Sequence, residues 1–442
     1  MKKCVNLKIS PEGRFIVKKD GAPFFWLADT AWELFHRLNK EEAVEYLATR
    51  AAQRFNVIQA VALAEFDGLA VPNAYGRTPL LKNSGEFDPT LPDVGGEYDY
   101  WSHVDYIVDT ACKLGLYIGL LPTWGDKFNI MWGAGPAIFT PENAHTYGKW
   151  IGERYKERDN IIWIMGGDRA IENETHSAIV RNMAQGIKES TCGKHLMTYH
   201  PTGGNSSSEY GIHGESWLDF NMIQSGHGRA YTKNYEYVQK DYALAPVKPT
   251  LDGEPRYEDH AIGFDAANGY FDEHEVRVAA YWAVLSGALG HTYGHHSIWS
   301  FATSVSDYYT DKVGYFPVKW RDALHRPGGE QMKYVAELFN SRNFLELAPC
   351  QELLCENYTG SNYMSAAKGK NYAYIYAPNG LDIKVNMAVL GGKSATANWY
   401  NPRNGAYKFA GIYRNESVAN FAPPSCGRNN DWVLVLDISD II

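Results

Sequence analysis

The sequence predicts an α/β protein in which a (β/α)8 TIM barrel is followed by a small C-terminal β-sandwich. Apolar runs and amphipathic stretches alternate for about 300 of the 442 residues, which is typical of repeated βα units. Several runs are apolar throughout, as strands are when both faces of a sheet are buried. After residue 342 the pattern changes to short alternating strands. We therefore expect a barrel over residues 1–342 and a β-sandwich over residues 343–442.

The apolar runs give eight expected barrel strands, and amphipathic stretches between them give helices. The strands are 24–28, 57–63, 116–121, 161–165, 195–199, 220–224, 249–251 and 290–293. Four of the helices are 40–54, 103–114, 141–158 and 273–289. The third helix has a clear start, because Thr140 can cap it and Pro141 suits the first helical position. Residues 66–101 are rich in Gly, Pro and Asp, which favours an insertion over the barrel mouth.

The C-terminal region has its own strands at 372–377, 383–390, 395–401 and 432–436. Asn404-Gly405 predicts a hairpin after the third of these strands, because this dipeptide tolerates the backbone angles of tight turns.

Composition excludes some classes of protein. The 42 basic and 51 acidic residues give a net charge of −9 without a basic patch, so we expect no nucleic-acid partner. Thirteen Trp and 30 Tyr supply flat apolar faces that suit sugar rings, although large barrels also use aromatic residues in their cores. The motifs of zinc proteases, serine hydrolases, P-loop proteins and dinucleotide-binding proteins are missing.

The location of the protein is inferred from weaker signals. No run is long enough to span a membrane, and the N-terminus lacks the apolar segment of a signal peptide. As given, the chain is therefore either cytoplasmic or already trimmed of a leader. Cys350 and Cys355 could form a disulfide in an oxidising compartment, but their spacing leaves this open.

Two carboxylates, Asp168 and Glu254, follow the fourth and seventh expected strands. In a parallel barrel the carboxyl ends of all strands meet at one face, so residues far apart in sequence can line one pocket. Pro255 holds residue 254 extended, and Gly166-Gly167 allow a sharp turn before Asp168. Glycoside cleavage needs such a pair: one carboxyl group protonates the leaving oxygen, and the other attacks the anomeric carbon or activates water. The acid must have a raised pKa, while its partner stays ionised.

Other strand ends carry polar and aromatic side chains that could bind sugar hydroxyls and ring faces. These expected substrate-binding residues are Asp29, Glu65, Trp124, Asp126, Lys127, Tyr199, His200, Gln224, His227 and His296. Each could instead be a buried polar group with a structural partner, and Asp29 could cap the first helix. The histidines at 291, 295 and 296 could suggest a metal, but carboxylates at ligand spacing are missing, so we expect no metal and no cofactor.

Eight segments resemble glycoside hydrolase family 140, whose barrel is also called the DUF4038 domain. They are residues 21–36, 57–60, 72–76, 197–201 and 222–227, together with Leu120-Leu-Pro-Thr-Trp-Gly-Asp-Lys127, Ile161-Ile-Trp-Ile-Met-Gly-Gly-Asp-Arg169 and Leu251-Asp-Gly-Glu-Pro-Arg-Tyr-Glu-Asp259. The resemblance covers residues 7–342, and the tail resembles the collagen-binding-type β-domain that accompanies this barrel.

The resemblance implies a retaining apiosidase that acts on pectin. Such enzymes release apiose-containing side chains from the galacturonic acid backbone of rhamnogalacturonan II. They are usually exported, so the resemblance implies a periplasmic or otherwise exported protein whose leader has been removed, with the cytoplasm as the alternative. By position, Glu254 would be the nucleophile and Asp168 the acid/base. Related retaining barrels usually have Asn-Glu after strand four, whereas this chain has Gly-Asp, so a shorter carboxyl arm must reach the glycosidic oxygen.

Two rival interpretations belong to other classes. A non-catalytic carbohydrate-binding or adhesin-like protein could use the same aromatic residues and carboxylates to bind a glycan without cleaving it. A metal-dependent hydrolase could use the histidines after the eighth strand. Loss of turnover but not of binding in Glu254→Gln would exclude the first rival, and full activity after chelation would exclude the second.

Overall fold

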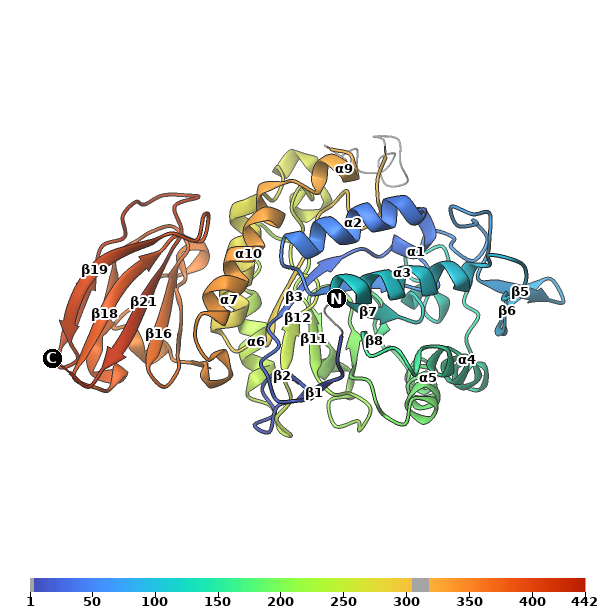
Figure 1. Ribbon diagram of the computed structural model, residues 1–442, viewed down its shortest axis with the longest axis horizontal. Coiled ribbons are helices and arrows are strands. Elements are labelled where there is room, and N and C mark those ends of the chain that lie inside the picture. Colours follow the sequence, from blue (N-terminus) through green and yellow to red (C-terminus); the bar gives the residue numbers. More distant parts are fainter. Residues whose placement is uncertain (1–3, 304–317, 442) are drawn as a thin grey trace.

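A curled parallel sheet forms the centre of the N-terminal domain in the computed structural model, which describes residues 4–303 and 318–441 (Figure 1). Its six strands lie in the order β13-β3-β4-β7-β8-β9. Their bounds are β3 (Trp26–Thr30), β4 (Val57–Val61), β7 (Tyr117–Leu121), β8 (Ile161–Gly166), β9 (Met197–His200) and β13 (Gly290–Tyr293). Each strand is completely buried, so both of its faces are covered.

Two more parallel strands, β11 (Asn221–Gln224) and β12 (Thr250–Asp252), pair with each other in a second sheet. The short antiparallel strand β10 (Asn205–Ser206) lies at its edge. Backbone hydrogen bonds connect this sheet to both ends of the first: Asp219 N donates to Met197 O at 2.8 Å, and Leu289 N donates to Thr250 O at 2.9 Å. All eight expected strands are therefore present, with bounds that differ by no more than two residues from those expected.

Helices cover the outside of the parallel strands (Figure 1). They are α1 (Leu34–Arg37), α2 (Lys40–Ala52), α3 (Tyr100–Leu114), α4 (Pro141–Tyr155), α5 (Glu174–Ser190), α6 (Asn234–Tyr242), α7 (Glu273–Leu285), α9 (Trp320–Ala323) and α10 (Pro327–Asn340). The four helices named from the sequence correspond to α2, α3, α4 and α7. The start of α4 is confirmed: Thr140 Oγ1 accepts a hydrogen bond from Asn143 N, and Pro141 is the first helical residue.

The insertion at 66–101 divides into two parts. Its second half forms an antiparallel hairpin of β5 (Leu80–Asn83) and β6 (Glu86–Pro92), which contacts α4 and projects from the body of the domain (Figure 1). Its first half lines a pocket described below. A separate hairpin of β1 (Leu7–Ile9) and β2 (Ile16–Lys18) precedes the parallel strands.

The C-terminal domain is antiparallel and rich in β-structure. A six-stranded sheet has the order β14-β15-β16-β21-β18-β19, and β17 pairs with β20 separately. The bounds are β14 (Ala348–Pro349), β15 (Ser365–Lys368), β16 (Tyr372–Ala377), β17 (Ile383–Asn386), β18 (Ser394–Tyr400), β19 (Tyr407–Arg414), β20 (Val418–Phe421) and β21 (Trp432–Ser439).

Two details of this domain bear on the sequence predictions. The expected hairpin is confirmed, because Asn404 and Gly405 lie in the turn between β18 and β19, where Gly405 has a φ of 73°. The expected strand 383–390 is too long. It ends at Asn386, and Met387–Leu390 form a 3-10 turn that contributes Met387 and Leu390 to the core of the domain.

The two domains pack against each other through α7. Arg277 on this helix forms an ion pair with Asp431, with Nε 3.0 Å from Oδ2 and both side chains fully buried. The Tyr281 ring stacks on Tyr376 with centroids 4.7 Å apart. Because removal of one partner leaves the other charge buried and unpaired, separating the two domains would carry an energetic cost.

Two further properties complete the description. In the described part of the chain all six cysteines carry free thiols, Cys350 and Cys355 among them. A search of the described helices finds none that is both long and apolar enough to cross a membrane.

Candidate active site

Glu254 lies directly after β12, in a segment with several backbone anchors. Gly253 N donates to Ile223 O at 2.8 Å, and the Glu254 carbonyl accepts from Gly226 N at 3.0 Å. A side chain at position 253 would collide with Met222, since a Cβ there would lie 2.6 Å from its sulfur. A larger residue at position 253 would therefore displace the Met222 side chain, and the backbone hydrogen bonds to β11 fix the position of Glu254.

Two histidines hold the Glu254 carboxylate. His200 Nε2 lies 3.0 Å from Oε2, and His227 Nε2 lies 3.2 Å from Oε1. Burial alone would raise the pKa of Glu254, but hydrogen bonds and electrostatic attraction from the histidines outweigh it and lower the pKa to about 2. Glu254 is therefore a buried carboxylate, with a side chain 8% exposed, that stays ionised near neutral pH.

Asp168 lies after β8 on a turn of three residues with positive φ. The angles are 86° at Gly166, 110° at Gly167 and 52° at Asp168. A Cβ at Gly167 would lie 2.8 Å from the Trp124 ring, so the turn also needs glycine for space. The Asp168 backbone N donates to His200 Nδ1 at 3.1 Å. The turn therefore brings the backbone of Asp168 to the same histidine that contacts Glu254.

This network assigns the tautomer of His200. Because Nδ1 accepts the Asp168 N–H, the proton of the neutral ring lies on Nε2, from which it is donated to Glu254. His200 thus links the backbone of one carboxylate residue to the side chain of the other.

The Asp168 side chain has a pKa displaced in the opposite direction. Burial raises it, the negative charge of Glu254 adds to this, and the pKa reaches about 6 despite the opposing effect of Arg169. The side chain remains 19% exposed, and Oδ2 accepts from Trp132 Nε1 at 3.1 Å. Asp168 can therefore hold a proton in mildly acidic solution and present it at the surface.

Three of the predicted binding residues lie against these carboxylates. His200 and His227 contact Glu254, and a hydrogen bond from the Gln224 amide opposes the rise in the pKa of Asp168. Glu65 is close enough for its pKa to be raised well above the usual range, first by burial and then by the charges of Glu33, Asp126 and Asp168. These residues gather at the carboxyl ends of the strands.

Other predicted binding residues face structural partners instead. Asp29 does not cap the first helix: Oδ2 accepts from Tyr46 Oη at 2.6 Å and from Arg50 Nε at 2.7 Å, in a fully buried ion pair with α2. Asp126 and Lys127 pair with each other at 2.7 Å and are also fully buried. In their present positions these three side chains hold the fold together and are not accessible to a ligand.

The remaining predicted residues pack beneath the site. Tyr199 Oη donates to Arg169 O at 2.7 Å, behind the Asp168 turn. Trp124 lies under the same turn, with its ring centroid 5.3 Å from that of Trp32 and 6.0 Å from that of His200. His296 is buried and meets the His260 ring edge-on at 4.8 Å. Tyr199 and Trp124 thus contact residues of the carboxylate site, and all three side chains are buried.

Sequence reasoning missed three side chains of the site. Tyr257 packs on the His227 ring at 4.4 Å, and burial, then the charge of Glu254, raises the pKa of this phenol well above its usual value. Arg169 and Trp132 contact Asp168. Tyr257 and Arg169 stand three and one residues after the two carboxylates, so proximity in sequence was an available signal. Trp132 has no such signal, because it lies in an irregular loop.

The histidines in and directly after β13 do not converge on a metal site in the described part of the chain. His295 Nε2 pairs with Asp259 Oδ2 at 3.1 Å, and burial lowers the pKa of His291 to about 3. Within residues 4–303 and 318–441, no group of three or more His, Cys, Asp or Glu side chains is placed to hold a metal ion.

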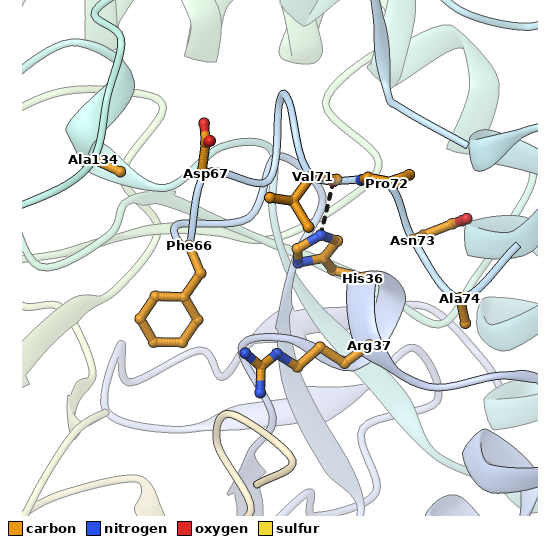
Figure 2. A pocket seen from close by; sticks show the side chains of 9 residues that line it. All are labelled: His36, Arg37, Phe66, Asp67, Val71, Pro72, Asn73, Ala74 and Ala134. Carbon is orange, nitrogen blue, oxygen red and sulfur yellow. Dashed lines mark hydrogen bonds between the residues drawn. The ribbon is translucent and has the colours of Figure 1, made fainter. Parts of the chain in front are cut away.

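A pocket of about 690 Å³ extends to Ala134, two residues after Trp132, in the loop that contacts Asp168 (Figure 2). Its lining comes from α1, from the first half of the 66–101 insertion and from one residue of the loop that contains Trp132: His36, Arg37, Phe66, Asp67, Val71, Pro72, Asn73, Ala74 and Ala134. Figure 2 shows the Arg37 guanidinium reaching beneath Phe66. Its Nη1 donates to Ser300 O at 3.0 Å, and the group is partly exposed. The pocket therefore presents the Arg37 guanidinium together with the Asp67 carboxylate.

The fold and the site together define a class of protein. A parallel sheet whose carboxyl ends carry one carboxyl group with a raised pKa and one with a lowered pKa is the arrangement that cleaves glycosidic bonds. A solved structure described as a glycoside hydrolase is similar over 100% of both chains, with 33% identity and a TM-score of 0.90. A second, described as a glycoside hydrolase family 5 protein from Bacteroides vulgatus ATCC 8482, covers 98% of this chain and 93% of its own, with 31% identity and a TM-score of 0.89. The protein is a glycoside hydrolase.

The family is more specific. The model of the apiosidase-like catalytic domain matches residues 10–346, and the model described as "Putative collagen-binding domain of a collagenase" matches residues 348–437. The chain therefore belongs to the apiosidase-like family. No curated protein matches the sequence.

Proposed function

We propose that the protein is a retaining glycoside hydrolase with Glu254 as nucleophile and Asp168 as acid/base. The observation that carries this proposal is the opposite displacement of the two pKa values, to about 2 for Glu254 and about 6 for Asp168. A nucleophile must be ionised and an acid protonated at the same pH, and these values leave a window between them in which both conditions hold.

The reaction would proceed in two displacements. Asp168 gives its proton to the glycosidic oxygen while Glu254 attacks the anomeric carbon, so the leaving sugar departs as an alcohol and a covalent glycosyl-enzyme forms. Asp168, now ionised, then takes a proton from a water molecule that attacks the same carbon and releases Glu254. The contacts from His200 and His227 hold the Glu254 carboxylate in one orientation throughout.

The finer architecture belongs to the same proposal. We infer that the eight parallel strands close into a (β/α)8 barrel, because β9 contacts β11 and β12 contacts β13 at the two seams between the sheets. We also infer that the C-terminal domain is a β-sandwich in which the β17-β20 pair covers the six-stranded sheet. Its buried contact with α7 favours a supporting role for this domain over collagen binding.

For the substrate we propose apiose linked to galacturonic acid in the rhamnogalacturonan II of pectin. The match to the apiosidase-like model supports the sugar that is released. Arg37 supports an acidic neighbour, because a guanidinium group pairs well with the carboxylate of a uronic acid.

The decisive experiment is to incubate the protein with apiose-bearing fragments of rhamnogalacturonan II and to identify the released sugar. NMR of the first product should show the anomeric configuration of the substrate.

Glu254→Gln should abolish turnover and keep binding, which would separate an enzyme from a carbohydrate-binding protein. Arg37→Leu should raise KM for fragments with free carboxylates and leave KM for methyl-esterified fragments unchanged. In the NMR experiment, a first product with the anomeric configuration opposite to that of the substrate would exclude the retaining mechanism.

A further inference from the structure

Trp132 is an exposed tryptophan beside a carboxyl group of the site. Its side chain is 58% exposed, and Ile130 and Met131 next to it are also exposed. Most large aromatic side chains of this protein are buried, whereas this exposed indole contacts a site carboxylate and so offers an apolar surface to a ligand.

Buried polar groups hold the loop that carries Trp132. The Arg169 side chain is fully buried, and its Nε donates to Asn129 O at 2.9 Å. At the other end of the loop, Gly135 N donates to Asp126 Oδ2 at 2.9 Å, and Asp126 is itself paired with Lys127. The indole is therefore presented by an anchored loop, which reduces the entropy lost when a ligand packs on it.

One face of the indole is covered and the other is available. The Arg169 guanidinium carbon lies 4.6 Å from the centre of the Trp132 ring, which places a cation on one face. With more than half of the side chain exposed, the opposite face is open to solvent. Flat faces of this kind pack against the C–H faces of sugar rings.

The indole also touches the reacting group. Trp132 Nε1 donates to Asp168 Oδ2 at 3.1 Å, and Arg169 Nη1 lies 3.3 Å from the same oxygen. An oxygen that accepts from two donors is a poor place for a proton. These two donors fix Oδ2 on the Trp132 side, which leaves Oδ1 as the oxygen that can face the glycosidic bond.

The loop that carries Trp132 leaves β7, which lies on the side of β8 away from β9 and His200. Trp132 follows β7, Asp168 follows β8 and His200 ends β9, and these strands are consecutive neighbours. His200 leads from β9 to Glu254, whereas β7 is on the other side of β8. The sugar being transferred must lie between the two carboxylates, so the leaving sugar extends past Asp168 toward Trp132.

We propose that Trp132 forms the subsite for the leaving-group sugar: its open face stacks on that sugar ring, and its N–H fixes Asp168 with Oδ1 toward the glycosidic oxygen. This inference rests on the proposed function of Asp168 and Glu254. Ala134, two residues further along the loop, lines the pocket that contains Arg37, so a longer leaving group would continue into that pocket.

The test compares Trp132→Ala and Trp132→Phe on two substrates that release the same sugar. One substrate carries a sugar as its leaving group. The other is the glycosyl fluoride, whose leaving group is a fluoride ion and which therefore places no sugar in the leaving-group subsite. Stacking of an aromatic ring changes binding by about tenfold, so Trp132→Ala should raise KM by about that factor for the first substrate and leave KM for the fluoride unchanged. Phe409→Ala, at an exposed aromatic residue of β19 in the other domain, is the matched control and should change neither.

Trp132→Phe keeps a ring but removes the N–H donor, so it should preserve KM for the sugar substrate. Loss of that donor removes a hydrogen bond that favours ionised Asp168, and the upper limb of the pH profile should move to higher pH. Equal KM changes on both substrates, or no change in Trp132→Ala, would overturn the subsite. Failure of the proposed function would look different, since the wild-type protein would then cleave neither substrate.

Discussion

Removing the two site charges one at a time should change stability in opposite directions. Asp168 has its pKa raised from 3.8 to about 6, first by burial and then by Glu254, so at pH 7 folding holds an ionised group where ionisation is unfavourable. Glu254 has its pKa lowered from 4.5 to about 2, because the hydrogen bonds from His200 and His227 outweigh its burial. We predict that Asp168→Asn stabilises the protein at pH 7 and that Glu254→Gln destabilises it.

The magnitude follows from the size of the shifts. Each pKa displacement is roughly two units, and each unit corresponds to about 1.4 kcal/mol, so each charge contributes at most about 3 kcal/mol to the free energy of unfolding at pH 7. With an unfolding entropy of about 2 cal/mol/K per residue, this corresponds to a change in Tm of about 3 °C for a chain of this length.

The dependence on pH provides a second check. Destabilisation by Asp168 is complete above its folded pKa of about 6 and disappears below the unfolded value of 3.8, so the gain in Asp168→Asn should largely vanish at pH 4. Stabilisation by Glu254 is complete above 4.5 and is lost as the pH falls through about 2, so the loss in Glu254→Gln should persist at pH 5.

Thermal unfolding of both variants by calorimetry at pH 4, 5 and 7 measures these changes. Asp382→Asn, at an exposed aspartate, is the control and should leave Tm within error. A decrease in Tm at pH 7 for Asp168→Asn as large as that for Glu254→Gln would refute the reasoning, because it would show that the folded protein favours the ionised form of Asp168.

Three further predictions concern activity and the domain interface. The value of kcat/KM for a sugar substrate should fall about tenfold per pH unit above pH 6, as Asp168 loses its proton, and a rate that stays level to pH 8 would contradict its role as the acid. His200→Ala removes a donor to Glu254, so the midpoint of the acidic limb of the pH profile should shift from about pH 2 toward pH 4. An unchanged midpoint would mean that other groups lower the pKa of Glu254. Arg277→Leu leaves Asp431 buried without its main partner and should lower the free energy of unfolding by about 3 to 5 kcal/mol, measured by denaturant titration, while Arg277→Leu with Asp431→Leu should recover most of it.

The fold could be predicted well from the sequence because its strands are buried on both faces. A run such as Ile161–Gly166 is apolar at nearly every position, and only a buried strand or a buried helix satisfies that pattern. The same signal failed at 383–390, where Met387–Leu390 are apolar for another reason: they form a turn with two side chains in the core. An apolar run identifies buried residues, but it does not fix their backbone conformation.

The candidate site could be predicted only as far as strand ends allow. Strand order brings Asp168 and Glu254 to one edge, and that follows from the alternating pattern. Which polar groups face a ligand depends on contacts with distant helices. Asp29 also lies near the end of a parallel strand, where a binding residue would be expected. However, Tyr46 and Arg50 on α2 both donate hydrogen bonds to its Oδ2. Trp132 shows the opposite case, because an irregular loop has no periodicity from which an exposed indole could be inferred.

The buried contact between Arg277 and Asp431 determines how this chain can be divided. Removing the residues after 342 would expose Tyr281 on α7, because Tyr376 packs on its ring. It would also leave the Arg277 guanidinium without the Asp431 carboxylate and expose it to water. The isolated N-terminal part should aggregate or unfold at a lower temperature, and the tail cannot be exchanged for another module without redesign of α7. The boundary between the residues matched by the two family models is therefore not a site at which this chain can be cut into two independently stable domains.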